Sequence, residues 1–161
     1  MRKPIGGILR PAFAIQFSDD APPAWKRFES RASGRWHASK RTNRHASTPA
    51  NAMLNYAYAA TLNRIIRELI AHDLDPAFGF LHCQKNGRAS LAYDALEIIR
   101  PAIERAIVEY VQSHIFAKSD FPVMDMTIRC GRDVARDLLK IARAQDARGA
   151  VELIARLIAS S

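Results

Sequence analysis

Apolar residues recur at steps of three and four along residues 49–72, which predicts one long amphipathic helix. The start is marked by Thr48, whose hydroxyl can accept from a free N–H group of the first turn, and by Pro49, which needs no backbone donor there. The helix is expected to end near His72, ahead of Asp75–Pro76. Its apolar stripe consists of Met53, Leu54, Ala57, Tyr58, Leu62, Ile65, Ile66, Leu69 and Ile70.

A second apolar stripe begins after a loop that contains Pro76, Gly79 and Gly87, and Ser90 is the candidate N-cap. The stripe consists of Leu91, Ala95, Leu96, Ile98, Ile99, Ile103, Ile107, Val108 and Val111. Pro101 lies inside it, so the pattern predicts either one kinked helix or two helices.

The remaining segments complete an all-α fold, a helical bundle over residues 49–161. Residues 121–128 form either a short strand or an extended linker, and helices are expected near 131–145 and 148–159. Residues 1–48 are rich in Pro, Gly, Ser and Arg without a sustained helical period. This first part is predicted to be an irregular basic arm.

The net charge of the chain indicates a polyanionic partner. Lys and Arg number 24 against 16 Asp and Glu, a net charge of +8 that attracts polyanions, most often nucleic acid. Between Lys26 and His45 the cations are Lys26, Arg27, Arg31, Arg35, Lys40, Arg41 and Arg44, against the single acid Glu29. With Trp25 and Trp36 interleaved, the arm could track phosphates and stack on bases. A basic loop whose tryptophans dock on the core is the alternative.

Apolar runs, the N-terminal stretch and the number of cysteines bear on the cellular compartment. No run of about 18 apolar residues occurs, so no membrane span is expected. Pro4 and Pro11 interrupt the N-terminal apolar stretch, which favours a non-signal over a secretory leader. Cys83 and Cys130 are too few for a disulfide framework, so the reducing cytoplasm is expected.

The candidate chemistry lies within residues 79–100. Asp94 and Glu97 are three apart on the predicted second helix, so their carboxylates share one face beside apolar neighbours. Two adjacent like charges there need a cation, which a divalent metal, Arg88 or Arg100 would supply.

A histidine adds to this pair. His82 precedes the helix in a loop that could fold back over it, and an imidazole with carboxylates suits Mn²⁺ or Mg²⁺. Zinc through Cys83 is a weaker alternative, because no second cysteine stands at ligand spacing. The plain alternative is a solvated acidic helix face and a structural histidine.

Three motifs in order resemble the CRISPR-associated endonuclease/integrase family that inserts new spacers. They are NAMLNYAYA at 51–59, GFLH at 79–82 and GRASLAYDALEIIRP at 87–101. The family's usual run is a basic stretch, a DPxNALLNYGYA-like helix, GFLH and GRxSLALDLMExFRP. The resemblance extends more faintly over residues 25–111.

The resemblance implies a site, position by position. His82, Asp94 and Glu97 match catalytic residues that hold Mg²⁺ or Mn²⁺ together with a glutamate from an earlier helix. The residues expected to contact DNA are Arg41, Arg44, Lys85, Arg88 and Arg100, of which the last two could instead orient the carboxylates. Asn51, Asn55 and Tyr56 match a structural motif expected to hydrogen-bond the first helix against the active-site loop.

The implied function is that of a metal-dependent DNA endonuclease/integrase of CRISPR adaptation. Attack by a DNA 3′-hydroxyl gives integration, attack by water gives cleavage, and His82 could be a ligand or a proton donor. DNA is the implied partner, while a homodimer and a small adaptation partner protein are open. A non-catalytic DNA-binding or interaction module with the same fold is the alternative, followed by a basic helical protein without a nucleic-acid role.

The sequence departs from the family at its start. A β-rich first domain and an early glutamate motif of the form EGxxAxxYW are not found, and Glu29, Asp19 and Asp20 lie in different contexts. One metal ligand is therefore expected to be missing and activity to be impaired. A degenerate remnant, one domain of a split system and a family member with a late start are the competing explanations.

Overall fold

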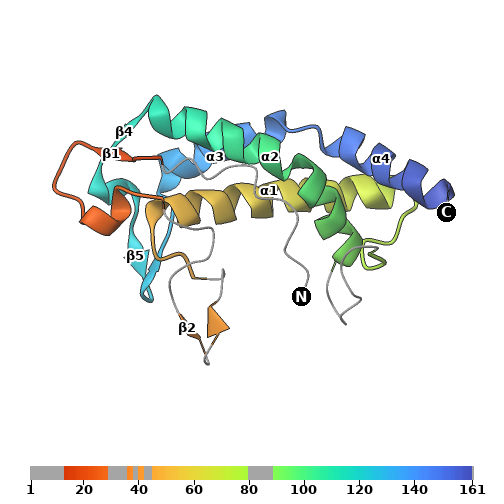
Figure 1. Ribbon diagram of the computed structural model, residues 1–161, viewed down its shortest axis with the longest axis horizontal. Coiled ribbons are helices and arrows are strands. Elements are labelled where there is room, and N and C mark those ends of the chain that lie inside the picture. The colour runs from red at the N-terminus through yellow and green to blue at the C-terminus, as the bar shows by residue number, and fades with distance from the viewer. Residues whose placement is uncertain (1–12, 29–35, 38–39, 42–44, 80–88, 161) are drawn as a thin grey trace, which may run out of the picture.

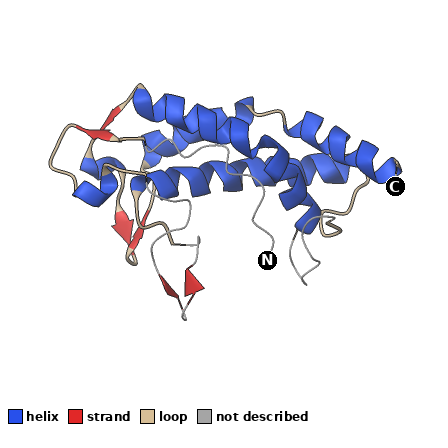
Figure 2. Ribbon diagram, in the orientation of Figure 1, coloured by secondary structure: helices blue, strands red, loops and turns tan. Residues whose placement is uncertain are grey.

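Four helices form the body of the described part of the molecule (Figures 1 and 2). The computed structural model describes residues 13–28, 45–79 and 89–160, together with the backbone of two short strands at 36–37 and 40–41. The helices are α1 (Pro49–Ala71), α2 (Ser90–Gln112), α3 (Arg132–Ala144) and α4 (Ala147–Ala159). Helices α1 and α2 run side by side in opposite directions, and both pack against α3 and α4. The all-α prediction is confirmed.

Helix α1 begins and ends where the sequence predicts. The Thr48 hydroxyl oxygen accepts from the backbone N–H of Asn51 at 3.2 Å, and the helix ends at Ala71 with His72 as its C-cap. Most of the predicted stripe faces the core, but Ile70 is 60% exposed. The reason is geometric, because each residue turns the helix by about 100° and so places Ile70 well round from the buried Leu69.

Helix α2 is one bent helix rather than two. Pro101 lies inside it, and Figure 1 shows the helix changing direction along its length. A proline has no N–H group to donate to the carbonyl four residues earlier, that of Glu97, and its ring crowds that carbonyl. The kinked-helix alternative is therefore the correct one.

The predicted cap of α2 is wrong. Ser90 is the first residue of the helix, and its buried hydroxyl has no hydrogen-bond partner within the described part of the chain. Instead, the carbonyl of Pro76 accepts from the backbone N–H groups of Leu91 at 2.8 Å and Ala92 at 3.4 Å. The preceding loop thus satisfies donors that a capping side chain would otherwise serve.

Short strands and turns occupy the ends of the helices. Strand β1 (Gln16–Phe17) pairs in parallel with β4 (Ile115–Phe116), and β2 (Trp36–His37) pairs antiparallel with β3 (Lys40–Arg41). Residues 121–128 form the strand alternative, a hairpin of β5 (Val123–Met124) and β6 (Thr127–Ile128). Two 3₁₀ turns, η1 (Pro23–Trp25) and η2 (Lys118–Asp120), lie beside them.

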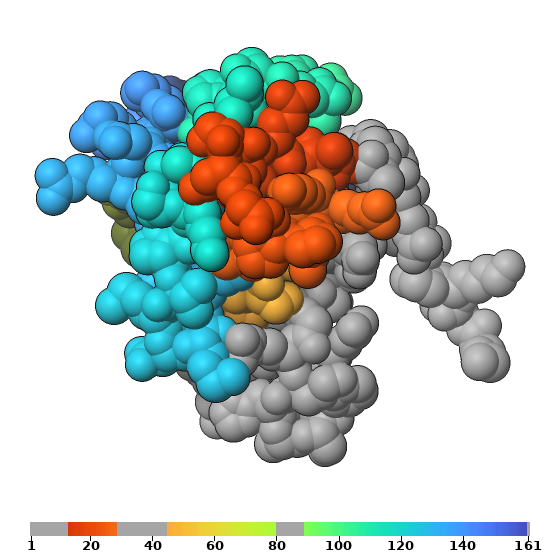
Figure 3. All heavy atoms as spheres, turned by 90° about the vertical axis from the view of Figure 1, so that its left-hand side faces the viewer, coloured from red at the N-terminus to blue at the C-terminus, as the bar shows by residue number. Residues whose placement is uncertain are grey.

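Residues 13–28 pack onto one end of the helical body. Figure 3 shows this segment lying against the residues that follow α2. The aromatic rings of Phe17, Trp25 and Phe121 pack at centroid distances of 6.0–6.4 Å, and Trp25 is buried. Trp25 thus docks on the core, which agrees with the alternative that the tryptophans of the basic arm pack on the protein and do not stack on bases. The division of the chain near residue 48 stays a prediction.

The closing helices match their predicted ranges to within one residue. A side chain of α1 contacts the junction of these two helices. The Arg64 guanidinium donates from Nη1 to the carbonyls of Ala142, Arg143 and Gln145 at 2.6, 3.0 and 3.0 Å. These carbonyls at the end of α3 lack helical donors, so Arg64 caps α3 from another helix. At the start of α4, the Asp146 carboxylate accepts from the backbone N–H of Gly149 at 2.8 Å.

None of the helices in the described ranges combines the length and the apolar character needed to cross a bilayer.

Replacing Arg64 by Met should lower the free energy of unfolding by about 2 kcal/mol, because the end of α3 loses a charged donor shared by three carbonyls. Urea denaturation followed by circular dichroism measures the change. Arg67→Met is the matched control, because Arg67 is exposed and, among the described residues, donates only to the carbonyl of Asn63 on its own helix. It should change stability by less than about 0.5 kcal/mol. Equal effects of the two variants would contradict the capping role.

Candidate functional site

Asp94 is held in the interior on the first half of α2. Its side chain is only 1% exposed. A Cβ atom added at Gly79 would lie 3.0 Å from the Asp94 Oδ2 atom and 2.6 Å from the Ser90 Cβ atom. Only glycine fits this close approach, so the first residue of the GFLH motif packs directly beside the Asp94 carboxylate.

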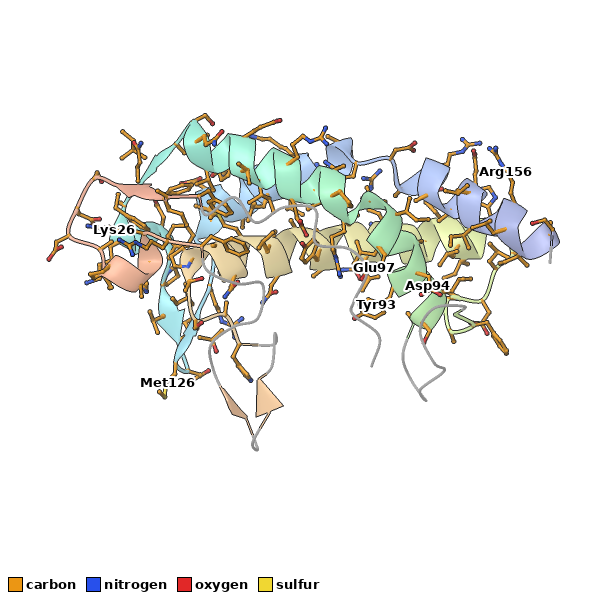
Figure 4. All side chains as sticks on the ribbon, viewed as in Figure 1. Lys26, Tyr93, Asp94, Glu97, Met126 and Arg156 are labelled. Atoms are coloured by element: carbon orange, nitrogen blue, oxygen red, sulfur yellow. The ribbon has the colours of Figure 1, made fainter. Side chains whose placement is uncertain are left out.

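Glu97 lies one turn further along α2, at the edge of the same region. Figure 4 labels both acids on the first half of the helix. The Glu97 side chain is 37% exposed, and its Oε1 atom forms an ion pair with Arg100 Nη1 at 2.6 Å. The predicted pair of acids therefore consists of one buried carboxylate and one that is half exposed and held by an arginine.

Arg100 has a second contact, on α1. Its guanidinium carbon lies 5.0 Å from the centroid of the Tyr58 ring, within the range of a cation–π interaction. The Tyr58 hydroxyl in turn donates to the Oε1 atom of Glu104 at 2.6 Å, and Glu104 is 7% exposed. The structure thus places Arg100 against a carboxylate, and its contact with DNA stays a prediction.

The predicted asparagine and tyrosine motif lies in the first turns of α1. Asn51 is buried, its backbone N–H donates to Thr48, and its Oδ1 atom has no hydrogen-bond partner within the described residues. Asn55 and Tyr56 are half-buried, and the Tyr56 ring packs against the core. Hydrogen bonds between this motif and the active-site loop stay a prediction.

Several predicted site residues lie outside the described residues. They are His82, Lys85, Arg88 and Arg44, together with Cys83. Arg41 lies in β3, of which only the backbone is described. The convergence of His82 with Asp94 and Glu97 therefore stays a prediction.

The donor chemistry of the described acids fits a hard divalent ion. Carboxylate oxygens are the ligands that Mg²⁺ and Mn²⁺ favour, and Asp94 and Glu97 supply them one turn apart on α2. Among the residues that the structure describes, no three His, Cys, Asp or Glu side chains gather as a complete metal site. Asp94 and Glu97 would thus be part of a ligand set that needs His82 or a further donor.

The family model for the CRISPR associated protein Cas1 matches residues 22–142, which include Gly79, both acids and Arg100. The chain belongs to the Cas1 family. The resemblance carried by the three motifs is thereby confirmed.

Curated Cas1 relatives match over part of their length. The CRISPR-associated endonuclease Cas1 of Leptospira interrogans is 39% identical over 82 residues, which cover 51% of this chain and 32% of that protein. The CRISPR-associated endonuclease Cas1 1 of Archaeoglobus fulgidus is 31% identical over 112 residues, or 69% of this chain and 32% of that protein. The matched part of this chain thus spans about a third of each relative.

A solved structure shares the fold of this Cas1-family chain. A casposase bound to integration product superposes with a TM-score of 0.65 at 24% sequence identity. The match covers 76% of this chain and 35% of the casposase. The helical arrangement described above therefore recurs in that protein.

Sequence patterns did not single out two described residues, Tyr58 and Glu104, whose side chains connect to Arg100. Tyr58 was assigned to the apolar stripe of the first helix, and Glu104 was not singled out. A signal for Glu104 existed, because this acid interrupts the apolar face between Ile103 and Ile107. A charged residue at a buried helix position needs a polar partner, and Tyr58 is that partner.

Two side chains with clearly shifted pKa values, Tyr110 and Cys130, lie away from Asp94 and Glu97. Burial, followed by the nearby Asp137 carboxylate, raises the pKa of the Tyr110 phenol above its usual value. Burial raises the pKa of the Cys130 thiol to about 12. Because thiolate is the form that attacks electrophiles and binds metal, Cys130 is not suited to either task at neutral pH.

In a Cys83→Ser variant, the remaining Cys130 should react with iodoacetamide at pH 9 at least about tenfold more slowly than free cysteine. The raised pKa leaves little thiolate at pH 9, and the rate should keep rising as the pH approaches about 12. Mass spectrometry of the alkylated protein over time measures the rate under native conditions. A rate that levels off near pH 9 would contradict the raised pKa.

Proposed function

We propose that this chain is a metal-dependent DNA endonuclease/integrase domain of CRISPR adaptation, acting in the cytoplasm. The observation that carries the proposal is the pair of acids on α2: Asp94 is buried against Gly79, and Glu97 stands one turn away. This pair lies within the part of the chain that matches the Cas1 family. The relatives named above are called endonucleases, and the casposase is bound to an integration product.

Asp94 and Glu97 would hold the ion, with His82 as a third ligand or as the donor of a proton. When bound, Mg²⁺ or Mn²⁺ supplies Lewis acidity toward the scissile phosphate. Burial of Asp94 favours this role, because a carboxylate removed from water gains more from a nearby cation than an exposed one does.

The reaction is an in-line exchange of phosphoester bonds. A DNA 3′-hydroxyl loses its proton to solvent as its oxygen forms a bond to phosphorus, the bond to the leaving oxygen breaks, and the leaving oxygen takes up a proton. Water in place of the hydroxyl gives cleavage. His82 belongs to the motif whose first residue, Gly79, packs beside the buried acid, and it would supply the proton if it is not a ligand.

The cationic side chains would bind the DNA backbone. A net charge of +8 on 161 residues favours a polyanionic partner. Arg41, Arg44, Lys85 and Arg88 are proposed to contact phosphates, whereas Arg100 is held against Glu97 and Tyr58. A homodimer and a small adaptation partner protein would complete the assembly around the DNA.

Asp94→Asn should abolish Mn²⁺-dependent cleavage of a branched DNA by the 161-residue chain, with a loss of at least about a hundredfold. The amide has the shape of the carboxylate but no charge for the ion. Glu97→Gln and His82→Ala should lose Mn²⁺-dependent cleavage to a similar extent. Asp133→Asn is the control, because Asp133 is exposed on α3 and, within the described part of the chain, pairs only with Arg136 one turn away. Gel analysis of labelled DNA measures the rates, and cleavage retained by Asp94→Asn would refute the assignment.

Integration by the 161-residue chain alone should be weak or absent in the same assay. These residues contain no counterpart of the early glutamate motif of the family, and they span about a third of each relative. Robust joining of a 3′-hydroxyl end by the chain alone would contradict this expectation.

A non-catalytic DNA-binding module is the second candidate, and the Glu97–Arg100 ion pair favours it. At 2.6 Å, the guanidinium already neutralises the carboxylate that the metal would need. Titration calorimetry with Mn²⁺ separates the two candidates. The enzyme predicts a binding heat that disappears in both Asp94→Asn and Glu97→Gln, whereas the module predicts DNA binding without any such heat.

A further inference from the structure

The bend of α2 divides the candidate site from the second half of the helix. Asp94 and Glu97 precede Pro101, and Glu104 follows it. The proline removes the backbone hydrogen bond that would otherwise join residue 101 to the carbonyl of Glu97. The helix is thus weaker at this point than elsewhere, and side-chain contacts across the bend help to fix the direction of its first half.

Tyr58 of α1 contacts both sides of this bend. Before the proline, its ring faces the guanidinium of Arg100 at 5.0 Å. After the proline, its hydroxyl donates to the Glu104 carboxylate at 2.6 Å. A hydrogen bond from a phenol to a buried carboxylate is short and strong, because the acceptor is charged and far from water.

Arg100 passes this constraint on to Glu97. Its Nη1 atom lies 2.6 Å from Glu97 Oε1, while its Nε atom is buried without a hydrogen-bond partner in the described part of the chain. The orientation of the guanidinium therefore depends on the Tyr58 ring and on Glu97. Carboxylates that bind metals are commonly held by such a hydrogen-bond partner, whose loss lowers metal affinity by about 10- to 100-fold.

We propose that Tyr58 and Glu104 are positioning residues for metal binding by Glu97. Together they hold the two halves of α2 across Pro101 and fix Arg100, which sets the orientation of the Glu97 carboxylate. Neither residue touches the ion. This inference rests on the proposed function, because it requires that Glu97 bind a divalent cation.

The test is Tyr58→Phe in the full chain, with Mn²⁺ affinity measured by titration calorimetry. The variant keeps the ring under Arg100 and removes only the hydroxyl that binds Glu104. We expect Mn²⁺ to bind about tenfold more weakly, the lower end of the range for such partners. Glu104→Gln keeps an acceptor for the hydroxyl and should lose less affinity than Glu104→Leu, which has none.

Tyr110→Phe is the matched control. It also removes a tyrosine hydroxyl that faces a carboxylate, Asp137 at 3.5 Å, but it does so in the last turns of α2, away from both acids. A purely structural hydroxyl would alter the free energy of unfolding without altering Mn²⁺ affinity. We expect that pattern for Tyr110→Phe and a loss of affinity for Tyr58→Phe.

The outcomes separate this inference from the proposed function. Wild-type Mn²⁺ affinity in Tyr58→Phe overturns the positioning role and leaves the metal site intact. No Mn²⁺ heat in the wild-type chain, or a heat that persists in Asp94→Asn and Glu97→Gln, overturns the proposed function and the positioning role together. If Tyr58→Phe does not fold, the Mn²⁺ affinity of Arg100→Lys is compared with that of the wild-type chain instead. This variant keeps the positive charge but loses the planar contact with the Tyr58 ring. Wild-type affinity in that variant would likewise overturn the inference.

Discussion

The packing of α1 against a bent α2 is the constraint on which the rest of the molecule depends. Ile65 and Leu69 of α1, together with Ile103 and Ile107 of α2, are completely buried in this core. Each such side chain contributes roughly 1.5–3 kcal/mol when it leaves water, which offsets the cost of burying polar groups nearby. The apolar contacts hold the two helices in place, and the acids of α2 are carried with them.

Two charged groups in or beside this packing, Glu104 and Arg64, take partners from another helix or its end. Glu104 lies beneath the surface because Tyr58 of α1 donates to it, and Gly79 allows the loop to approach Asp94. Arg64 reaches from α1 to the end of α3 in the same way. These polar contacts add specific pairings between helices to the apolar contacts that hold them together.

This arrangement links the fold to the proposed chemistry. A phosphoryl-transfer site needs carboxylates held in fixed positions, because loss of orientation lowers both metal binding and rate. The Cas1-family chain provides one deeply buried acid and a second that pairs with an arginine, both on the first half of α2. The chain spans about a third of each relative, so in the proposed function the remaining length of such a protein would contribute further ligands and DNA contacts.

The sequence by itself determined the local features. Thr48 and Pro49 mark the start of α1 because capping depends on neighbouring residues, and a spacing of three places Asp94 and Glu97 on one face of α2. The order of three motifs also indicated the family, since residue identities are all that such a comparison needs. Tertiary structure decided the cap of α2 by the Pro76 carbonyl, the contact of Tyr58 with Glu104 and the reach of Arg64 to α3. These groups are distant in the chain, and helical periodicity says which face is buried but not which residue of another element will meet it.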